Sequence, residues 1–449
     1  MKIENRKNEF FGLSENDLKI IRSKENPNLK YIGDIQEKVR RFVSFHNRNL
    51  YKVSKIRFKK DAVSQLENIF ELLNFKVENS NLNKHLPNSL PIDPSILNAM
   101  LFCFDALKKY NSFKLKSFSK KLNNYKKELN QFLEKEYQKE FLKGEIFNND
   151  FIKIFNYEKF NLSKNKVNQG VVILSPNRYS LFSLSTIALC NKLQIPIKSI
   201  IVRRFSIKRF KNEFKRDGYL LLKKIYRKLI LKSDENANKI LISLKEICSK
   251  LTGGFSDIKK MANARKIPLI FVDEFEESNN FLLKNKADIA LFTGGGFIKK
   301  SFLNNFKIGI INLHMGILPF YKGMDVVESP LSEGRFDFVG LTSHIMDAQI
   351  DTGPLIKIYK LNPFYYESLG SLRNEIGLIM PFLLVDSFLK LTSNEKVLNR
   401  QKLLGRQYYF LHRDLISIIN EVLFKNYNHK ELTEVNKFIF EISKKLGID

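Results

Sequence analysis

The chain has 449 residues, of which 43% are hydrophobic and 27% are charged, an ordinary globular mixture. Its length is enough for two or three domains and a large core. The formal net charge of +29 is spread along the chain, which excludes a single basic tail as its source and indicates a general compositional bias. A basic field attracts anions such as nucleotides or RNA, but specific nucleic-acid binding is not favoured.

The cysteines and the apolar runs indicate a cytoplasmic protein without a metal site. The three cysteines are Cys103, Cys190 and Cys248. Their wide spacing fits neither a disulfide framework nor a zinc pattern, so a reducing compartment is the simplest interpretation. The start, "MKIENRKNEF", lacks the apolar stretch of a signal peptide. The apolar run at 376–391 is short and contains a proline and an aspartate, so it predicts a core helix and no membrane span.

Residues 1–165 predict a helical N-terminal domain of unknown role. Apolar residues recur at helical spacing over 61–75 and 91–110. The stretch 113–145 is long, charged and amphipathic, which is typical of a helix with one solvated face. No chemical motif accompanies these helices, so their sequence does not indicate a function.

The pattern changes after the polar linker "NLSKNKVNQG" at 161–170. Short, almost continuously apolar runs now alternate with helical stretches, which predicts an α/β domain with a mostly parallel sheet over 166–395. The expected buried strands are 171–175, 196–202, 267–272, 287–293 and 308–314. Two more strands joined by a polar loop are expected at 338–346 and 355–361, and helices at 366–391 and from 411 onwards. Residues 396–449 are predicted to form a helical C-terminal extension.

A basic insertion at 205–251 separates the second and third expected strands. It is too long for one crossover helix. A helical hairpin with a charged outer face is the simpler interpretation, and a surface that steers anions towards the active site is the alternative. The sequence does not decide whether this insertion contacts a substrate.

Ligands of open parallel sheets bind beyond the carboxyl ends of the strands. The residues expected at those ends are Ser175–Ser180, Arg203–Arg204, Thr293–Ile298 and Asn312–Gly323. The run "TGGGF" at 293–297 lets a ligand approach the backbone closely. It matches neither a phosphate-binding GK[ST] loop nor the GxGxxG fingerprint. Simple turn geometry explains it equally well.

The stretch "INLHMGILPFYKG" at 311–323 carries the most specific chemistry. Asn312 and His314 are two positions apart and share one face of a strand. Asp351 lies in the loop "HIMDAQIDTGP", from which a carboxylate can approach the strand ends. An amide that stabilises an oxyanion, an imidazole and a carboxylate together suit acyl transfer to an amine without a covalent intermediate. Polar groups satisfied within turns are the alternative interpretation.

The stretches "NLHMGILPFYKG" and "GLTSHIMDAQIDTGPLI" resemble the folate-dependent formyltransferases, which act on glycinamide ribonucleotide, methionyl-tRNA or nucleotide-linked sugars. The resemblance runs from Val171 to Ile358 and implies a Rossmann-like catalytic domain. It implies Asn312, His314 and Asp351 as catalytic residues and 10-formyltetrahydrofolate as the formyl donor. Asn312 and protonated His314 would stabilise the oxyanion, while Asp351 would support His314 and help to move the proton.

The same resemblance implies residues that hold the folate. These are Phe297, Ile298, His344, Asp347 and Ile350. Two positions depart from the usual motif. Gly316 stands where many members have serine, although several sugar-modifying members have glycine, and the 293–297 loop is richer in glycine than most folate loops.

The acceptor is expected to be a primary amine of a small metabolite, with a nucleotide-linked amino sugar favoured. His344 matches the glycinamide-ribonucleotide and sugar enzymes, whereas the tRNA enzymes usually have methionine there. The chain is too long for the compact ribonucleotide enzyme, and its helical end differs from the β-rich C-terminal domain of the tRNA enzymes. The segment 405–415 resembles a tail found in some bacterial members. A methionyl-tRNA formyltransferase, kept open by the positive charge, and a catalytically inactive formyltransferase-like binding protein are the alternatives.

Overall fold

The computed structural model describes the following parts of the chain: most of 63–74, residue 77, 89–108, 111–142, 170–204, 239–294, 296, 298–323, 326–393, 398–401, 406–408 and 411–424. Most of the predicted hairpin at 205–251 lies outside these residues, as does the predicted helix beyond 424. The last part of the insertion, α10 (Lys239–Thr252), is a helix. The division of the chain at 165 and 395 stays a prediction.

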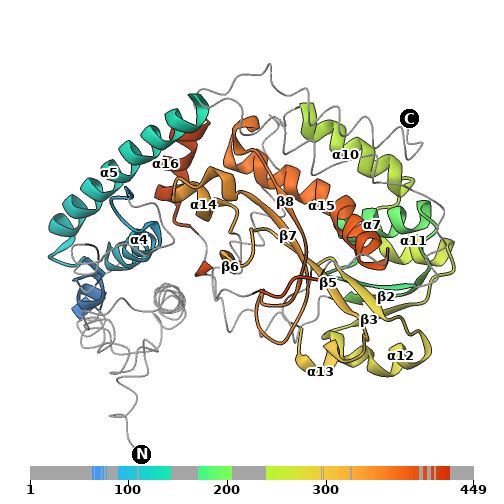
Figure 1. Cartoon of the computed structure of the whole chain (residues 1–449). Coiled ribbons are helices and arrows are strands. Elements are labelled where there is room, and N and C mark those ends of the chain that lie inside the picture. Colours follow the sequence, from blue (N-terminus) through green and yellow to red (C-terminus); the bar gives the residue numbers. More distant parts are fainter. Residues whose placement is uncertain are drawn as a thin grey trace, which may run out of the picture.

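A seven-stranded sheet with the order β3-β2-β1-β4-β5-β7-β8 forms the centre of the fold (Figure 1). Its strands are β1 (Val171–Ser175), β2 (Ile197–Arg203), β3 (Leu269–Val272), β4 (Ile289–Phe292), β5 (Gly309–His314), β7 (Gly340–Ile345) and β8 (Leu355–Lys360). The first five run parallel to one another, β7 is antiparallel to β5, and β8 is antiparallel to β7. The predicted mostly parallel sheet is therefore confirmed.

Helices cover both faces of this sheet (Figure 1). One face carries α7 (Leu181–Lys192), α10, α11 (Ile258–Ala264) and α15 (Leu369–Thr392). The other carries the 3-10 turn η3 (Phe275–Ser278), α12 (Asn279–Lys284) and α13 (Lys300–Leu303). Within the described part of the chain, no helix is both long and apolar enough to cross a membrane.

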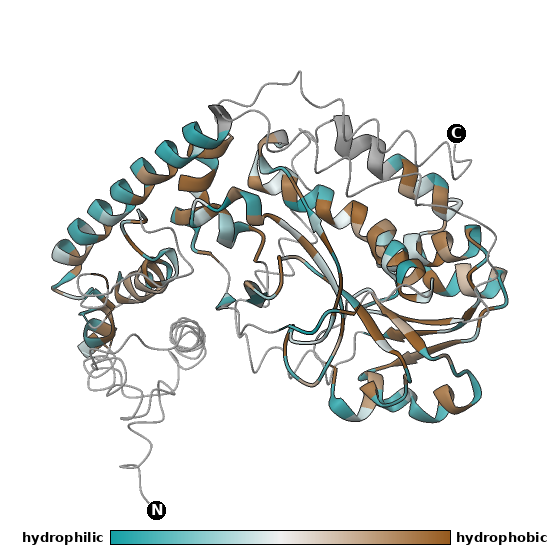
Figure 2. Ribbon diagram, in the orientation of Figure 1, coloured by the Kyte–Doolittle hydropathy of each residue, from teal (hydrophilic) through white to brown (hydrophobic). Residues whose placement is uncertain are grey.

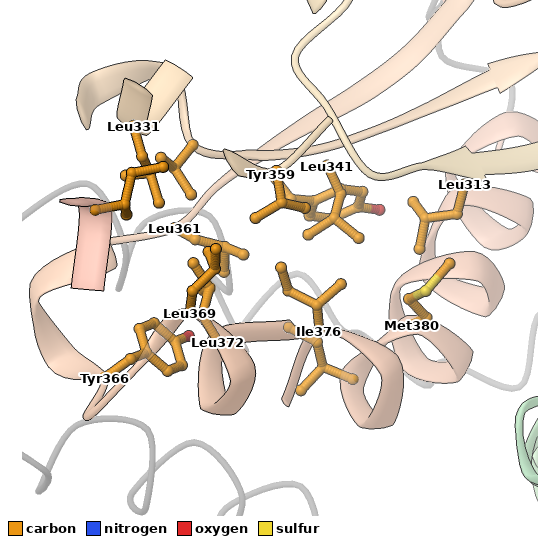
Figure 3. Packing of buried hydrophobic residues seen from close by; sticks show 14 of the residues in the cluster. Leu313, Leu331, Leu341, Tyr359, Leu361, Tyr366, Leu369, Leu372, Ile376 and Met380 are labelled. Atoms are coloured by element: carbon orange, nitrogen blue, oxygen red, sulfur yellow. The ribbon is translucent and has the colours of Figure 1, made fainter. Parts of the chain in front are cut away.

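The helix α15 packs against β5, β7 and β8. Ser368 caps its first turn through a reciprocal bond with Ser371. In Figure 3, Leu341 and Tyr359 of the sheet face Ile376 of α15, and all three side chains are buried. Burying side chains of this size stabilises the fold by roughly 1.5–3 kcal/mol each. This packed layer gives the strands of the site a rigid support.

The alternation of side chains along β5 places core residues on one face and the predicted catalytic residues on the other. Ile311 and Leu313 belong to the cluster on the α15 side. Ile310 belongs to the cluster on the α12 side, and because side chains alternate along a strand, Asn312 and His314 lie on this second face. On β7 the same alternation places His344 on the face opposite Ile345.

The two ends of the described chain pack together. The N-terminal helices α4 (Pro94–Lys108) and α5 (Leu115–Leu142) contact α16 (Arg413–Leu423), which in turn contacts α14 (Glu328–Ser332). The backbone N–H of His412 donates to Asn98 Oδ1 at 2.6 Å, and Lys126 Nζ lies 3.0 Å from Asp414 Oδ2. Figure 2 shows that α5 alternates hydrophilic and hydrophobic residues along its length, as expected from its sequence.

A second, two-stranded sheet differs from the sequence prediction. Its parallel strands are β6 (Tyr321–Gly323) and β9 (Arg406–Tyr408). Neither strand was predicted from the sequence, because three residues are too few to show a strand pattern. The remaining short 3-10 turns are η4 (Phe336–Phe338) and η5 (Pro363–Tyr365).

Candidate functional site

His344 orients the amide of Asn312 across two neighbouring strands. The two residues are paired in the register of β5 and β7. His344 Nδ1 lies 3.1 Å from the carbonyl oxygen of Ile345, which can only accept, so Nδ1 carries the proton. His344 Nε2 is then free to accept from Asn312 Nδ2 at 3.1 Å. The second N–H of Asn312 has no protein acceptor in the described structure, and Asn312 is half-buried.

His314 is held between a backbone carbonyl and a carboxylate. Its Nε2 donates to the carbonyl oxygen of Tyr321 at 2.8 Å. Its Nδ1 lies 3.4 Å from Asp351 Oδ2, and both side chains are buried. Both ring nitrogens therefore face oxygen atoms.

Asp351 reaches this face from the loop between β7 and β8. The residue has a φ of 55°, a left-handed conformation that is uncommon for residues other than glycine. Its Oδ2 accepts the backbone N–H of Gly323 at 3.0 Å, and its Oδ1 lies 3.7 Å from His344 Nε2. Within the loop, Thr352 Oγ1 donates to both carboxylate oxygens of Asp347, at 2.6 and 2.8 Å. The structure thus brings the three predicted catalytic residues together with His344.

The turn after β5 is hydrogen-bonded to β7. The hydroxyl of Thr342 donates to the carbonyl oxygen of Gly316 at 2.8 Å and accepts the N–H of Leu318 at 3.0 Å. A Cβ atom on Gly316 would lie 2.8 Å from the Tyr321 oxygen and 2.9 Å from His314 Nε2. Only a residue without a side chain therefore fits while His314 keeps its bond to Tyr321.

The side chain of Tyr321 anchors the other end of this turn. Its hydroxyl donates to Glu333 Oε2, and that of Tyr408 donates to Glu333 Oε1, each at 2.8 Å. The two rings stack with their centroids 5.0 Å apart. Burial raises the pKa of Tyr321 well above its usual value, so its hydroxyl stays protonated as a donor.

His344 is neutral at physiological pH. Burial lowers its pKa to about 4, although the nearby Asp351 carboxylate acts in the opposite direction. The neutral ring is what Asn312 requires, because only an unprotonated Nε2 can accept its N–H. Protonation of His344 would therefore break the contact that orients Asn312.

This pKa predicts a loss of stability in mild acid. An unfolded chain binds a proton at this histidine near pH 6.5 and the folded chain only near pH 4, so stability falls as the pH drops between these values. We expect the free energy of unfolding to fall by about 2–3 kcal/mol more in the unaltered protein than in His344→Gln between pH 7 and about 4.5. Urea titrations of both proteins at the two pH values measure this difference. Parallel pH dependences would contradict it.

The predicted folate-binding residues occupy different environments. Ile298 is 2% exposed and packs in the cluster on the α12 side, so only its backbone is available to a ligand. Ile350 is 51% exposed. Asp347 accepts a hydrogen bond from Thr352 within its own loop. Phe297 lies outside the described residues.

The ends of β1 and β4 are joined by buried hydroxyl groups. Ser183 Oγ lies 2.7 Å from both Ser175 Oγ and Thr293 Oγ1. In the loop between β1 and α7, Arg178 Nε donates to both carboxylate oxygens of Asp257, at 2.8 and 2.9 Å. These contacts fix the loops beyond the two strands.

The arginines at the end of β2 bind the acidic loop after β3. Arg203 Nη2 lies 2.9 Å from Glu274 Oε2, and its Nε donates to the Asp273 carbonyl oxygen at 3.1 Å. Arg204 Nε lies 2.6 Å from Asp273 Oδ1. These two predicted strand-end residues thus hold the structure of the neighbouring loop.

Several groups that form the site were not predicted from the sequence. The carbonyl oxygen of Tyr321 and the N–H of Gly323 act through the backbone, which leaves no residue signature. Lys322, between them, is buried, and this burial lowers its pKa despite the nearby Asp351 and Asp347. Gln401 contacts the Asp351 loop from 50 residues away in sequence, and nothing near it in sequence indicates that contact. Among the described residues, no group of three or more His, Cys, Asp and Glu side chains is arranged to hold a metal ion.

Comparison with known proteins identifies the segment that carries these residues. A family model described as formyl transferase matches residues 273–377, which run from the end of β3 into α15. The chain is 26% identical over 151 residues to a methionyl-tRNA formyltransferase of Coxiella burnetii and 32% identical over 109 residues to one of Microcystis aeruginosa. These matches cover 32% and 23% of this chain, and only 47% and 33% of the two relatives.

Solved formyltransferases also align with the structure. An N-formyltransferase from Helicobacter canadensis aligns with a TM-score of 0.36 and 15% identity, over 58% of this chain and 82% of that protein. A phosphoribosylglycinamide formyltransferase from Bacillus halodurans aligns with a TM-score of 0.34 and 16% identity, over 50% of this chain and 95% of that protein. The matched segment 273–377 contains Asn312, His314, His344 and Asp351. By this match, residues 273–377 carry the formyl transferase pattern, and this segment is similar to part of the methionyl-tRNA formyltransferases.

Proposed function

We propose that the chain is an N-formyltransferase that uses 10-formyltetrahydrofolate as the donor and a primary amine as the acceptor. The observation that carries this proposal is the contact between Asn312, His344, His314 and Asp351 on one face of the sheet. An oriented amide N–H beside a buried histidine–carboxylate pair suits acyl transfer to an amine. No Ser or Cys nucleophile motif such as GxSxG accompanies it in the sequence.

The surroundings of Asn312 fit a flat, amide-edged ring such as the pterin of the folate. Phe292, the last residue of β4, pairs with Asn312, so the glycine-rich loop after β4 starts beside it. Gly294 and Gly296 have φ values of 111° and 92°, which favour glycine, and neither residue places a side chain of its own over its backbone. The exposed Ile350 offers an apolar edge on the Asp351 loop.

Each residue has a distinct role in this proposal. The donor supplies a formyl carbon bound to nitrogen. The second N–H of Asn312 donates to the formyl oxygen as negative charge develops there. His314 holds Asp351 in place, because its own nitrogens are directed at Tyr321 and Asp351. As the new carbon–nitrogen bond forms and the old one breaks, the amine loses one proton and the donor nitrogen gains one. The Asp351 carboxylate is the group placed to hold that proton in transit.

A small-metabolite amine, with a nucleotide-linked amino sugar favoured, is the acceptor that we propose. His344 supports this choice, since the resemblance associates histidine at this position with enzymes of small acceptors. Methionyl-tRNA is the second candidate. It is favoured by the names of the curated relatives and by the net charge of +29, which would attract RNA.

One assay separates these candidates. Purified protein is incubated with 10-formyltetrahydrofolate and, separately, with a panel of nucleotide-linked amino sugars, other amine metabolites and initiator methionyl-tRNA. Release of tetrahydrofolate and mass spectrometry of the acceptor then report transfer. We expect a formylated amino sugar; formylation of the tRNA alone would establish the second candidate. Binding of folinic acid without formylation of any acceptor would indicate an inactive binding protein.

A further inference from the structure

A segment of the C-terminal extension touches the candidate site at two places. Leu355 and Asn399 form an isolated antiparallel bridge, with N–O distances of 2.8 and 3.0 Å. A few residues later, β9 pairs with β6, the strand whose backbone contacts His314 and Asp351. This segment lies beyond residue 377, where the matched family segment ends.

Between these two places, the side chain of Gln401 reaches the loop of Asp351. Its Nε2 donates to the carbonyl oxygens of Asp351 and Gly353, at 3.1 and 2.8 Å. The Gln401 Oε1 atom is buried without a hydrogen-bond partner in the described structure. If the Gln401 amide were rotated by 180°, its Oε1 would face the two carbonyl oxygens and repel them. The two hydrogen bonds from Nε2 therefore fix the orientation of the side chain.

Gln401 binds the part of the loop that has an unusual backbone conformation. Asp351 has a left-handed backbone, which persists only where its surroundings enforce it. Its carboxylate is held by the N–H of Gly323 and its carbonyl by Gln401. At Gly353, a Cβ atom would lie 1.8 Å from the carbonyl oxygen of Ile345, so the chain passes very close to β7. Asp351 is therefore held both at its carboxylate and at its backbone carbonyl.

We propose that Gln401 is a positioning residue for Asp351: by binding the carbonyl oxygens of Asp351 and Gly353, it holds the carboxylate against His314. The proposal rests on the proposed function in one respect, namely that Asp351 takes part in formyl transfer. It assigns to the extension a direct role in the geometry of the site. Because Gln401 touches only backbone oxygens, it has no part in the chemistry itself.

The test uses Gln401→Glu in the full-length protein. A carboxylate has nearly the same shape but cannot donate to a carbonyl oxygen, and it would repel both. The matched control is Gln407→Glu in β9, which adds the same charge to the same segment at a side chain that forms no hydrogen bond in the described structure. Gln401→Met, which removes the donors without adding charge, serves if the glutamate variant does not fold.

Hydrogen exchange gives a readout that does not depend on activity. The N–H of Gly323 donates to Asp351, so release of the loop should expose it to exchange. We expect the amide of Gly323 to exchange at least about tenfold faster in Gln401→Glu than in Gln407→Glu, as for any loop whose local opening becomes easier. Equal exchange in the two variants would overturn the proposal.

Kinetics then test the consequence for the reaction, on the acceptor that the panel identifies. We expect Gln401→Glu to lower kcat by about 10- to 100-fold with a smaller change in KM, because misplacement by about 1 Å has such effects. As the pH falls, the variant's kcat should recover relative to that of the unaltered protein, since the introduced carboxyl group regains one donor when it is protonated. Faster exchange with an unchanged kcat would overturn the positioning role. If the unaltered protein formylates no amine, the proposed function fails, while the exchange comparison still decides whether Gln401 holds the loop.

Discussion

Replacing Asn312 by alanine is expected to lower kcat by about 100- to 1000-fold, or roughly 2.7–4 kcal/mol of transition-state stabilisation. The second N–H of its amide is the donor that we assign to the formyl oxygen, and alanine offers no substitute. The free energy of unfolding should fall by only about 1–3 kcal/mol, because the buried Nε2 of His344 loses its donor, so the variant should remain folded. Single-turnover kinetics with a saturating acceptor measure the chemical step directly.

The control for this variant is Asn304→Ala. Asn304 is an exposed asparagine at the end of α13, eight positions before Asn312. The Asn304→Ala variant should retain full activity. A loss of activity in Asn312→Ala would then be due to the place of Asn312 in the site and not to the removal of an asparagine as such. A turnover in Asn312→Ala within a few-fold of that of the unaltered protein would refute the donor role of Asn312.

Gly316→Ala is expected to damage the site although it adds only one methyl group. The new Cβ would lie 2.5 Å from Val326 Cγ2, 2.8 Å from the Tyr321 oxygen and 2.9 Å from His314 Nε2. The His314–Tyr321 bond cannot survive in its present geometry, and the His314 ring must shift from its position between Tyr321 and Asp351. We expect kcat to fall by about 100-fold and the free energy of unfolding to fall by about 1–3 kcal/mol from overpacking.

Gly377→Ala is the matched control for that substitution. A Cβ at Gly377 meets no atom within 4 Å, and the residue lies inside α15. Alanine should therefore raise the free energy of unfolding by about 0.5–1 kcal/mol, because glycine is a poor helix former, and leave kcat unchanged. Urea unfolding and kcat measured on both variants complete the comparison. A fully active Gly316→Ala would show that the turn accommodates a side chain.

The sheet could be predicted from the sequence because its pattern is local. Most of the parallel strands are short apolar runs, and, apart from the long insertion at 205–251, short segments with a helical pattern separate them. The prediction of a strand at 308–314, for example, agrees with β5 to within one residue. The position of Asn312 and His314 on one face of β5 also follows from the alternation of side chains along a strand.

Other parts of the site depend on contacts that leave no local pattern. The bond from His314 to Tyr321 and that from Gly323 to Asp351 use backbone groups, which every sequence has. The pairing of β6 with β9 joins two three-residue strands that are far apart in sequence. The proximity of Asp351 follows from family resemblance and from the position of its loop, while its left-handed backbone is set by tertiary contacts.

The packing of α16 on α4 and α5 makes two distant segments of the chain depend on each other. Asn98 and His412 are bonded although they are 314 positions apart, and α16 buries an apolar face that would be exposed without the N-terminal helices. Removing either the N-terminal helices or α16 would expose an apolar surface on the other, and such surfaces promote aggregation. These two segments, far apart in the sequence, are therefore expected to depend on each other for solubility as well as for stability.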